Sequence, residues 1–324
     1  MITVLTGGTG GAKFVDGLRN IVPPEELTII VNSGDDMRWW GLHVSPDIDS
    51  IVYMLAGKIS EERGWGVERD TFFALKTIEQ MGEPAWFSVG DRDLAMHVVR
   101  TKLLSEGNTL SEATAEITRR LGIKARVLPM TNSPVETRVL TTVGELSFQE
   151  YFVQRRYQDE VKAVHFAGAS QAVPAPGVFD AIRSSELILL APSNPVTSIG
   201  PILAVPGIRA ALREAQGTIA AVSPIVGTAA VTGPAGALLA SQGFAVSIAG
   251  VADFYRDFLD LLVVDSQDAE FAAKLPRRNE SSATVGMHIT STIMRNHGDR
   301  VALARSVVEA CRQFTSTIGA AQRA

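Results

Sequence analysis

The chain has 324 residues, enough for two domains of roughly 150 residues each or for one large α/β unit with an insertion. Hydrophobic residues make up 46% and charged residues 20%, a globular composition that argues against intrinsic disorder. The formal net charge is −5 and no block of like charge occurs, so the concentrated basic face that nucleic-acid binding requires is absent and no nucleic-acid partner is expected.

Cys311 is the single cysteine, which excludes an intramolecular disulfide and a four-thiolate zinc site. The N-terminus is apolar from its start and has no basic segment, so it predicts a first strand and not a signal peptide. Residues 217–252 carry no charge, but Pro224, Pro234 and several glycines would open a helical backbone in lipid. We therefore expect a cytoplasmic protein with no membrane partner.

The chain opens with a predicted βαβ unit. Residues 2–6 are branched and apolar, lead into a glycine-rich tight loop at 7–11, and are followed by apolar residues at helical spacing. Residues 27–32 are apolar without a polar face, as in a parallel strand buried on both sides. Further all-apolar strands are predicted at 187–191, 219–222, 245–248 and 261–264. A doubly wound α/β fold with a mostly parallel, Rossmann-like sheet is the usual solution for such a series.

The stretch from 61 to 126 differs because it is charged and mainly helical, with one helix at 110–121 that Thr109 or Ser111 can cap. Residues 135–152 then predict a β-hairpin. The last residues, 316–324, are expected to fray. The expected organisation is a Rossmann-like nucleotide-binding core, 1–60 and 160–324, and a helical and β-hairpin insertion, 61–159.

The glycine-rich segment 7–11 is the first candidate ligand loop, because ligands of parallel sheets bind outside the carboxyl ends of the strands. Glycine lets a phosphate approach the backbone, and a helix N-terminus favours an anion. Lys13 stands where a dinucleotide-binding loop needs its third glycine, and the Gly-Lys-Ser/Thr end of a P-loop is missing. Phosphate or nucleotide binding of another kind is therefore predicted through Gly8, Thr9 and Gly10, with a structural turn as the alternative.

Two pairs of aspartates follow the second strand. Asp35 and Asp36 can accept hydrogen bonds from ribose or serve Mg²⁺ as hard oxygen ligands, and an N-cap or Asx turn explains either one equally well. A Ser-Pro pair predicts a helix start just before Asp47 and Asp49. Residues two apart on a helix point about 200° from one another, so only one of this pair can face a site.

A third polar segment contains Ser88, Arg92, Asp93 and His97. Arg92 keeps its charge and offers a planar fork to a phosphate or a carbonyl-rich ring. Asp93 and His97 are four residues apart, a spacing that favours a helix salt bridge over a metal pair. The tryptophans, at 39, 40, 65 and 86, are predicted to pack, although a flat heteroaromatic ligand would also use such surfaces.

The segment 192–201 again follows a buried strand and precedes a helix. Its candidate contacts to a pyrophosphate are Ser193, Asn194, Thr197 and Ser198. The loops 223–227 and 232–236 repeat the pattern. Several such loops at one sheet edge predict a long, phosphate-containing ligand.

The motifs together resemble the 2-phospho-L-lactate transferase family of coenzyme F420 biosynthesis, which includes bacterial phosphoenolpyruvate transferases. They are GGTGGAK (7–13), NSGDD (32–36), SPDID (45–49), GDRD (90–93), PSNPVTSIGP (192–201) and GVADFYRDFLD (250–260). The resemblance implies a Mg²⁺-dependent enzyme that moves a phospholactyl or phosphoenolpyruvyl group from a guanosine-diphosphate-activated donor to the ribityl hydroxyl of the deazaflavin Fo, releasing GMP. Phosphoglycerate is a third possible acid. A homodimer is expected, as is common for such enzymes.

The resemblance also implies roles for individual residues. Asp49 would meet the ribityl hydroxyl, directly or through Mg²⁺, and Asp35 or Asp36 would help hold the metal. We select Asp36 and Asp49 as the catalytic and metal-binding pair. The remaining substrate contacts would come from Gly8, Thr9, Gly10, Asp35, Ser88, Arg92, Ser193, Asn194, Thr197 and Ser198.

Two alternatives stay open. A sugar-nucleotide-binding regulator of the gluconeogenesis-factor type shares the glycine loop, but its acidic segment continues as Asp-Asp-Gly-Gly-Ser-Ser, whereas here Met37 follows Asp36. A dinucleotide oxidoreductase is disfavoured by Lys13. Both departures favour the transferase.

Overall fold

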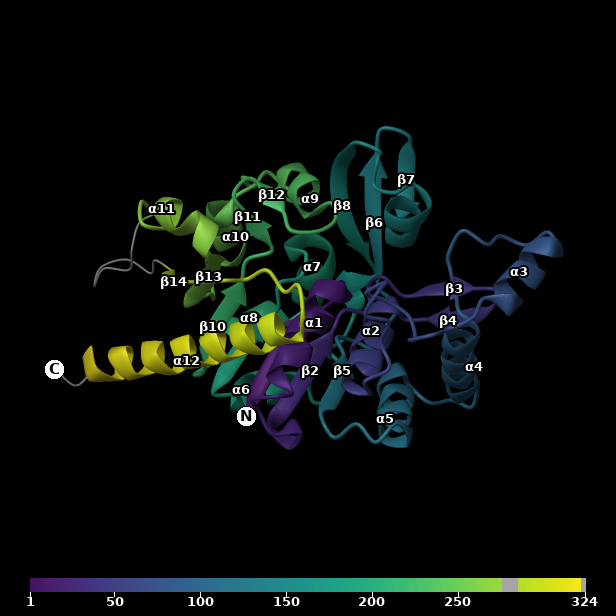
Figure 1. Ribbon diagram of the computed structural model, residues 1–324, viewed down its shortest axis with the longest axis horizontal. Helices are drawn as coiled ribbons and strands as arrows, with labels where there is room; N and C mark the ends of the chain where they lie inside the picture. The colour runs from purple at the N-terminus through teal and green to yellow at the C-terminus, as the bar shows by residue number, and fades with distance from the viewer. Residues whose placement is uncertain (276–284, 322–324) are drawn as a thin grey trace.

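The protein, seen in a computed structural model, is described over residues 1–275 and 285–321, without the side chains beyond residue 316. Within these ranges a seven-stranded, fully parallel sheet has the order β14-β13-β10-β9-β1-β2-β5 (Figure 1). Its strands are β1 (Ile2–Thr6), β2 (Leu27–Val31), β5 (Arg126–Pro129), β9 (Leu187–Leu190), β10 (Thr218–Val222), β13 (Leu261–Asp265) and β14 (Gly286–Thr290). The predicted doubly wound α/β fold is confirmed.

Both faces of the sheet are covered, which explains the lack of a polar face in its strands. Val4 and Leu5, adjacent in β1, are fully buried in two different cores. One core contains α1 (Gly8–Leu18), α2 (Pro46–Leu55), α5 (Leu110–Arg120) and α12 (His297–Ala321). The other contains α6 (Val178–Ser184), α7 (Gly200–Ala204), α8 (Ile208–Arg213), α9 (Ala235–Ser241), α10 (Ile248–Tyr255) and α11 (Ala269–Ala272).

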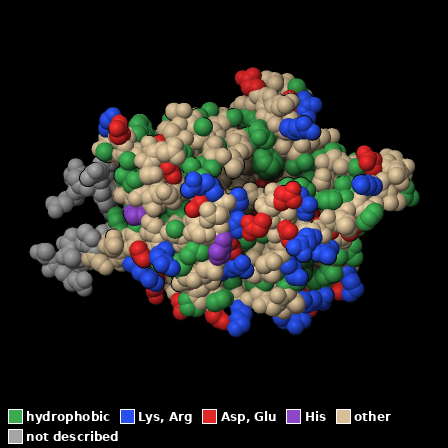
Figure 2. All heavy atoms as spheres, in the orientation of Figure 1, with side chains coloured by type: hydrophobic (Ala, Val, Ile, Leu, Met, Phe, Trp, Pro, Cys, Tyr) green, Lys and Arg blue, Asp and Glu red, His purple; other side chains and the backbone are tan. Residues whose placement is uncertain are grey.

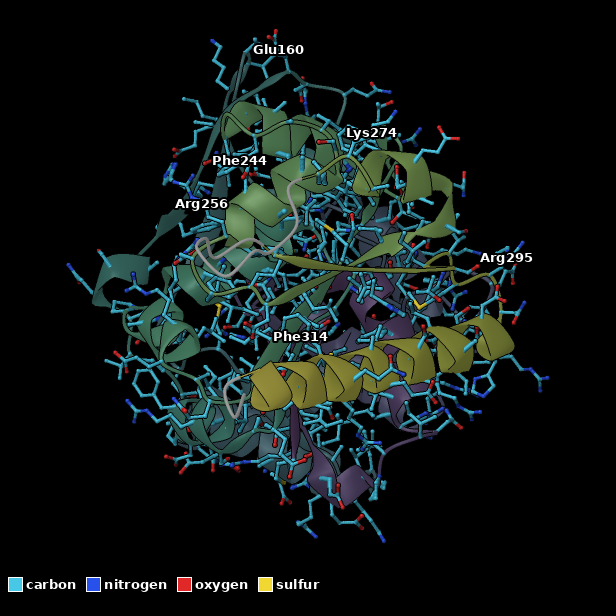
Figure 3. The ribbon with its side chains drawn as sticks, turned by 90° about the vertical axis from the view of Figure 1, so that its left-hand side faces the viewer. Glu160, Phe244, Arg256, Lys274, Arg295 and Phe314 are labelled. Carbon is cyan, nitrogen blue, oxygen red and sulfur yellow. The ribbon has the colours of Figure 1, made fainter. Side chains whose placement is uncertain are left out.

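The long helix α12 runs across one side of the molecule, with Arg295 just beyond one end and Phe314 near the other (Figure 3). It continues through most of the segment expected to fray, and residues 322–324 of that segment lie outside the described ranges. No helix among the described residues is long and apolar enough to cross a bilayer. Acidic and basic side chains are interspersed on the face shown in Figure 2, in line with the mixed charge of the sequence.

Two outer parts extend from the sheet. A three-stranded antiparallel sheet has the order β7-β6-β8, from β6 (Glu136–Thr141), β7 (Gly144–Ser147) and β8 (Val161–Ala167). An arm consists of β3 (Met37–Trp39), β4 (Leu42–Val44), α3 (Phe73–Gln80) and α4 (Asp91–Ser105), at the right of Figure 1. A small hairpin, β11 (Ile225–Val226) and β12 (Ala229–Ala230), completes the described elements.

The predicted hairpin is confirmed as β6 and β7, but its second strand stops at Ser147 because 150–154 form a π-helical turn. Of the two predicted caps for α5, Thr109 is the N-cap and forms a capping box with Glu112. The expected insertion, 61–159, contains α3, α4, α5, β6 and β7. It also contains β5, an edge strand of the central sheet, while β8 lies beyond its end.

The strand predicted at 245–248 is wrong. Ser247 instead caps α10, its side-chain oxygen accepting a hydrogen bond from the Gly250 amide, and the helix begins at Ile248. The four residues Ala-Val-Ser-Ile are too few to show a period that separates a buried strand from the start of a buried helix. The cap decides between them, because it satisfies an amide at the helix start.

Candidate active site

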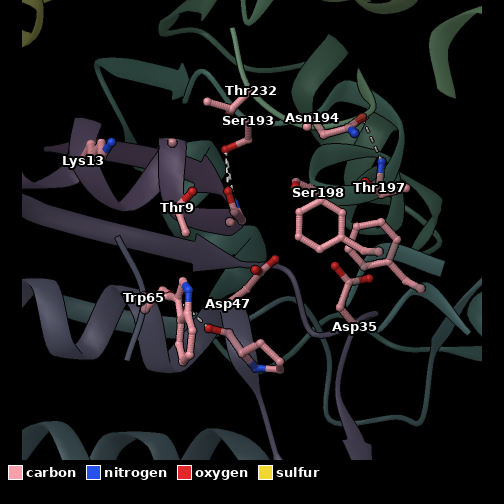
Figure 4. Close-up of a pocket in the computed structure, with 18 of the residues that line it drawn as sticks. Thr9, Lys13, Asp35, Asp47, Trp65, Ser193, Asn194, Thr197, Ser198 and Thr232 are labelled. Atoms are coloured by element: carbon pink, nitrogen blue, oxygen red, sulfur yellow. Dashed lines mark hydrogen bonds between the residues drawn. The ribbon is translucent and has the colours of Figure 1, made fainter. Parts of the chain in front are cut away.

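The site lies where the chain order of the sheet reverses. β1 pairs with β2 on one side and with β9 on the other, and such a switch point opens a crevice outside the carboxyl ends of the strands. A cavity of about 720 Å³ lies there. Its lining comes from the segments after β1, β9, β10 and β14, from α2, and from the outer parts of the molecule (Figure 4). The loops predicted to bind one long ligand thus share a single cavity.

The glycine segment is not an open loop, because α1 begins at Gly8 and includes Thr9 and Gly10 in its first turn. The first turn carries no acidic residue, and the N-cap residue Gly7 makes no side-chain cap. Gly10 has a structural reason to be glycine, since a Cβ there would lie 2.7 Å from the carbonyl oxygen of Pro192. The segment therefore packs closely against the β9 loop at Gly10, while the Gly8 backbone at the helix start already donates a hydrogen bond to the carboxylate of Asp47.

Ser193 joins the two loops at the switch point. Its hydroxyl donates to the Gly7 carbonyl (2.7 Å) and accepts from the Gly7 amide at 3.4 Å. Ser193, a predicted ligand contact, therefore links the loops after β1 and β9 by hydrogen bonds. Asn194 is also partly engaged, because its Oδ1 accepts from the amides of Val196 and Thr197.

Thr197 and Ser198 follow in the same segment and line the cavity. The Thr197 hydroxyl is buried without a hydrogen-bond partner in the described protein, and its backbone carbonyl accepts from Asn32 (3.2 Å). A buried hydroxyl without a partner costs free energy, which a hydrogen bond to a bound group would recover.

Two carboxylates of the cavity, Asp35 and Asp47, are buried close enough to repel each other. Burial and the charge of Asp47 raise the pKa of Asp35 well above its usual range. Burial raises the pKa of Asp47 from 3.8 to about 6, against hydrogen bonds from Asn32 and the Gly8 backbone that lower it. Asn32 donates to Asp47 Oδ2 at 2.9 Å, while Asp35 Oδ1 has no partner in the described protein. The negative charge of this buried pair must be neutralised by a bound cation or by protonation.

Asp36 and Asp49, the selected catalytic and metal-binding pair, occupy different environments. Asp36 does not line the cavity, because its Oδ2 accepts from the Ser45 hydroxyl (2.7 Å) and lies 2.9 Å from Nε2 of His43. Asp49 lines the cavity, but the guanidinium of the buried Arg100 takes both its oxygens in a bidentate pair. Of the two aspartates that begin α2, Asp47 is therefore the one whose carboxylate has no cationic partner among the described residues.

His97 stands between two carboxylates in the cavity wall. Its Nδ1 lies 3.5 Å from Asp49 and its Nε2 lies 3.4 Å from Asp93, which also accepts a hydrogen bond from the Tyr53 hydroxyl at 2.6 Å. The salt-bridge spacing predicted for Asp93 and His97 is thus present. One ligand atom from each of Asp49, Asp93 and His97 lies within 4.8 Å of the others, close enough for the three buried residues to hold a metal ion. Neither nitrogen of His97 has a hydrogen-bond partner in the described protein, but both oxygens of Asp49 are already paired with Arg100.

Ser88 and Arg92 were both predicted to contact the deazaflavin, but only one of them lines the cavity. Ser88 lines the cavity. Arg92 lies outside it on the exposed part of α4, and its guanidinium donates to the Glu68 carbonyl at 3.2 Å. Apart from Asp36 and Arg92, every predicted site residue lies around the cavity.

The prediction omitted several lining residues. They are Lys13, Asp47, Arg63, Trp65, Phe87, Phe148, Phe152 and the loop 292–294. Asp47 and Trp65 carried a sequence signal, as an aspartate at a helix start and as an unusual tryptophan. Phe148 and Phe152 carried none, because an aromatic pair beside a hairpin is indistinguishable from ordinary packing. In the structure their rings stack, with centroids 5.4 Å apart.

A model of the family described as 2-phospho-L-lactate transferase CofD matches residues 2–306. The chain belongs to this family. The 2-phospho-L-lactate transferase of Methanocaldococcus jannaschii is 40% identical over 315 residues, 96% of this chain and 98% of that one. The phosphoenolpyruvate transferase of Streptomyces griseus is 46% identical over 274 residues, 83% of this chain and 86% of that one. The resemblance predicted from the motifs is confirmed.

The fold of this CofD family member is similar to that of a solved structure. A member of the UPF0052 family from Bacillus halodurans superposes with a TM-score of 0.64, covering 95% of this chain and 98% of that one. The identity is 17%, so this likeness shows the fold alone.

Proposed function

We propose that the chain transfers a phospholactyl or phosphoenolpyruvyl group from a guanosine-diphosphate-activated donor to the ribityl hydroxyl of Fo, releasing GMP, in coenzyme F420 biosynthesis. Family membership supports a transferase of this class. One structural observation carries the proposal further. Asp35 and Asp47, two buried carboxylates without a cationic partner among the described residues, share one cavity with the N-terminus of α1, whose Gly8 backbone donates to Asp47. We infer that this arrangement suits a phosphoryl transfer between two bound substrates.

In the proposed reaction the hydroxyl oxygen of Fo forms a bond to the phosphorus that bears the acid. The bond from that phosphorus to the bridging oxygen breaks, GMP carries away the electron pair, and the hydroxyl proton is lost to a base or to solvent. The protein contributes alignment and charge stabilisation. Backbone amides of Thr9 and Gly10 and the Thr197 hydroxyl are placed to hold phosphate oxygens on the donor side.

The residues present fit Mg²⁺. Asp35 and Asp47 supply hard carboxylate oxygens, one of them without any partner in the described protein, and their mutual repulsion is the state that a divalent cation relieves. We propose these two, in place of the predicted Asp36 and Asp49, as the residues that would hold the ion. Bound there, Mg²⁺ would neutralise charge on the phosphates. The ion pair of Asp49 with Arg100 links α2 to α4. Because Asp47 is on the same helix, we propose that Asp49 helps to fix the position of Asp47.

The acceptor is proposed to enter past Ser88 and the stacked rings of Phe148 and Phe152, which offer a flat heteroaromatic molecule an apolar surface. We also expect the enzyme to work as a homodimer, which light scattering in solution would test, and to act in the cytoplasm.

The test is a transfer assay with purified protein, Fo and three donors: the guanylylated forms of phospholactate, phosphoenolpyruvate and phosphoglycerate. We expect GMP release that depends on Fo and on Mg²⁺ with at least one donor. Thermal shift with a UDP-sugar runs in parallel. Stabilisation by the UDP-sugar together with no transfer from any donor would contradict the proposal and support the regulator alternative.

A further inference from the structure

The segment between α2 and α3 brings a tryptophan to the cavity on a rigid support. Its base is an antiparallel bridge between Ile59 and Val67, and the Ser60 amide donates to the Gly66 carbonyl at 3.0 Å. Ile59, Ser60 and Val67 are buried, whereas Trp65 at the tip is 38% exposed and lines the cavity. A large aromatic side chain kept exposed on an ordered turn is more consistent with binding than with packing.

Trp65 is held from one side by a cation. The guanidinium carbon of Arg63 lies 5.5 Å from the centre of the Trp65 ring and 5.4 Å from the centre of the Phe72 ring. Arg63 also donates to the Val67 carbonyl at 2.7 Å. Its guanidinium, between two aromatic rings, limits rotation of the indole, and the rest of the indole surface is left to the cavity.

The same segment is tied to the helices behind the cavity. Glu61 forms a bidentate pair with Arg300 of α12, and Arg300 also donates to Asp16 of α1 at 3.0 Å. Arg300 and Asp16 are buried. The segment that carries Trp65 is therefore linked to α1 through Arg300, although the Glu61 side chain that makes the link is itself mostly exposed.

The position along α1 indicates which part of the substrates reaches Trp65. Thr9 and Lys13 are four residues apart on α1, so they share one helix face, and both line the cavity. Lys13 lies about 6 Å further along the axis than Thr9. A nucleotide whose phosphates sit at the helix start can thus extend past Lys13. Figure 4 shows Lys13 and Trp65 toward one side of the cavity and Asp35 on the other.

We propose that Trp65 is the stacking surface for the guanine base of the donor nucleotide, with Arg63 as the positioning residue behind it. This inference rests on the proposed function, since it names the part of the same cavity that takes the nucleotide. The second aromatic surface, Phe148 and Phe152, is left to the other substrate ring. Two separate aromatic surfaces in one cavity would allow both substrate rings to be bound at the same time.

The test measures GDP binding to the full chain by calorimetry and by tryptophan fluorescence. The variants are Trp65→Phe, which keeps an aromatic ring, and Trp65→Leu, which keeps bulk but cannot stack. Trp40→Phe is the matched control, because Trp40 lies outside the cavity. We expect Trp65→Leu to weaken GDP binding by about five-fold to one-hundred-fold and Trp65→Phe by less than about three-fold. GDP should quench the fluorescence of the wild type and of Trp40→Phe, and not that of Trp65→Phe.

Two results would overturn the inference: equal GDP affinities of Trp65→Leu and Trp65→Phe, or unchanged quenching in Trp65→Phe. Thermal unfolding of each variant controls for folding, which the exposure of Trp65 should leave unchanged. Failure of the proposed function has a different signature, because wild-type protein would then release no GMP from any donor. The GDP-binding result does not depend on that assay.

Discussion

Replacing Asp47 by Asn should stabilise the metal-free protein while abolishing transfer. Burial raises the pKa of Asp47 from 3.8 to about 6. Each pH unit corresponds to about 1.4 kcal/mol, so keeping Asp47 ionised at pH 7 costs the folded state about 3 kcal/mol. This cost is already net of the hydrogen bonds from Asn32 and the Gly8 backbone, which lower the pKa, and the amide can still accept one of them. The expected gain in the free energy of unfolding is therefore about 3 kcal/mol.

The pH dependence has a defined sign. Between 3.8 and about 6 the unfolded chain has already lost the Asp47 proton while the folded chain retains it. Wild-type stability should therefore fall as pH rises through this window and then level off, and the advantage of Asp47→Asn should grow over the same range. Mg²⁺ should stabilise the wild type and not the variant. Turnover in the variant should fall by about a hundred-fold or more.

The assay is chemical denaturation between pH 4 and 8, with and without Mg²⁺, together with GMP release. Asp16→Asn is the matched control. Burial raises the pKa of Asp16, but hydrogen bonds from Arg300 and His297 outweigh burial and lower it. This substitution should therefore destabilise the protein above pH 4. A less stable Asp47→Asn at pH 7 without metal, or a pH-independent difference from wild type, would refute the reasoning.

Two further substitutions test the placement of predicted residues. Arg100→Met should lower the free energy of unfolding by about 3–5 kcal/mol because it leaves Asp49 buried without its partner, and adding Asp49→Asn should recover part of that loss in a double-mutant cycle. Arg92→Ala should change stability by no more than about 0.5 kcal/mol and leave the KM for Fo unchanged, since the side chain lies outside the cavity; a raised KM would return Arg92 to the substrate site.

The central strands of the seven-stranded sheet were predictable and its two edge strands were not. β1, β2, β9, β10 and β13 have neighbours on both sides and helices on both faces, so they are buried along their length and mainly apolar. The edge strands β5 and β14 contain Arg126, Pro129 and His288, which an edge tolerates and which obscure the pattern. β3 and β4 have three residues each, too few to show a period.

The sequence by itself determined the family, the sheet and the loops that would meet at its edge, because parallel strands place their carboxyl ends together. Helical geometry also predicted that only one of Asp47 and Asp49 would face the site, but both line the cavity. Tertiary structure alone decided which of the two carboxylates has a cationic partner. Arg100, 51 residues further along the chain, neutralises Asp49, whereas Asn32 offers Asp47 an amide without charge. Whether a buried carboxylate is free to bind a cation depends on the charge of its protein partner. For Asp49 that partner is Arg100, which the packing of α4 on α2 brings into contact.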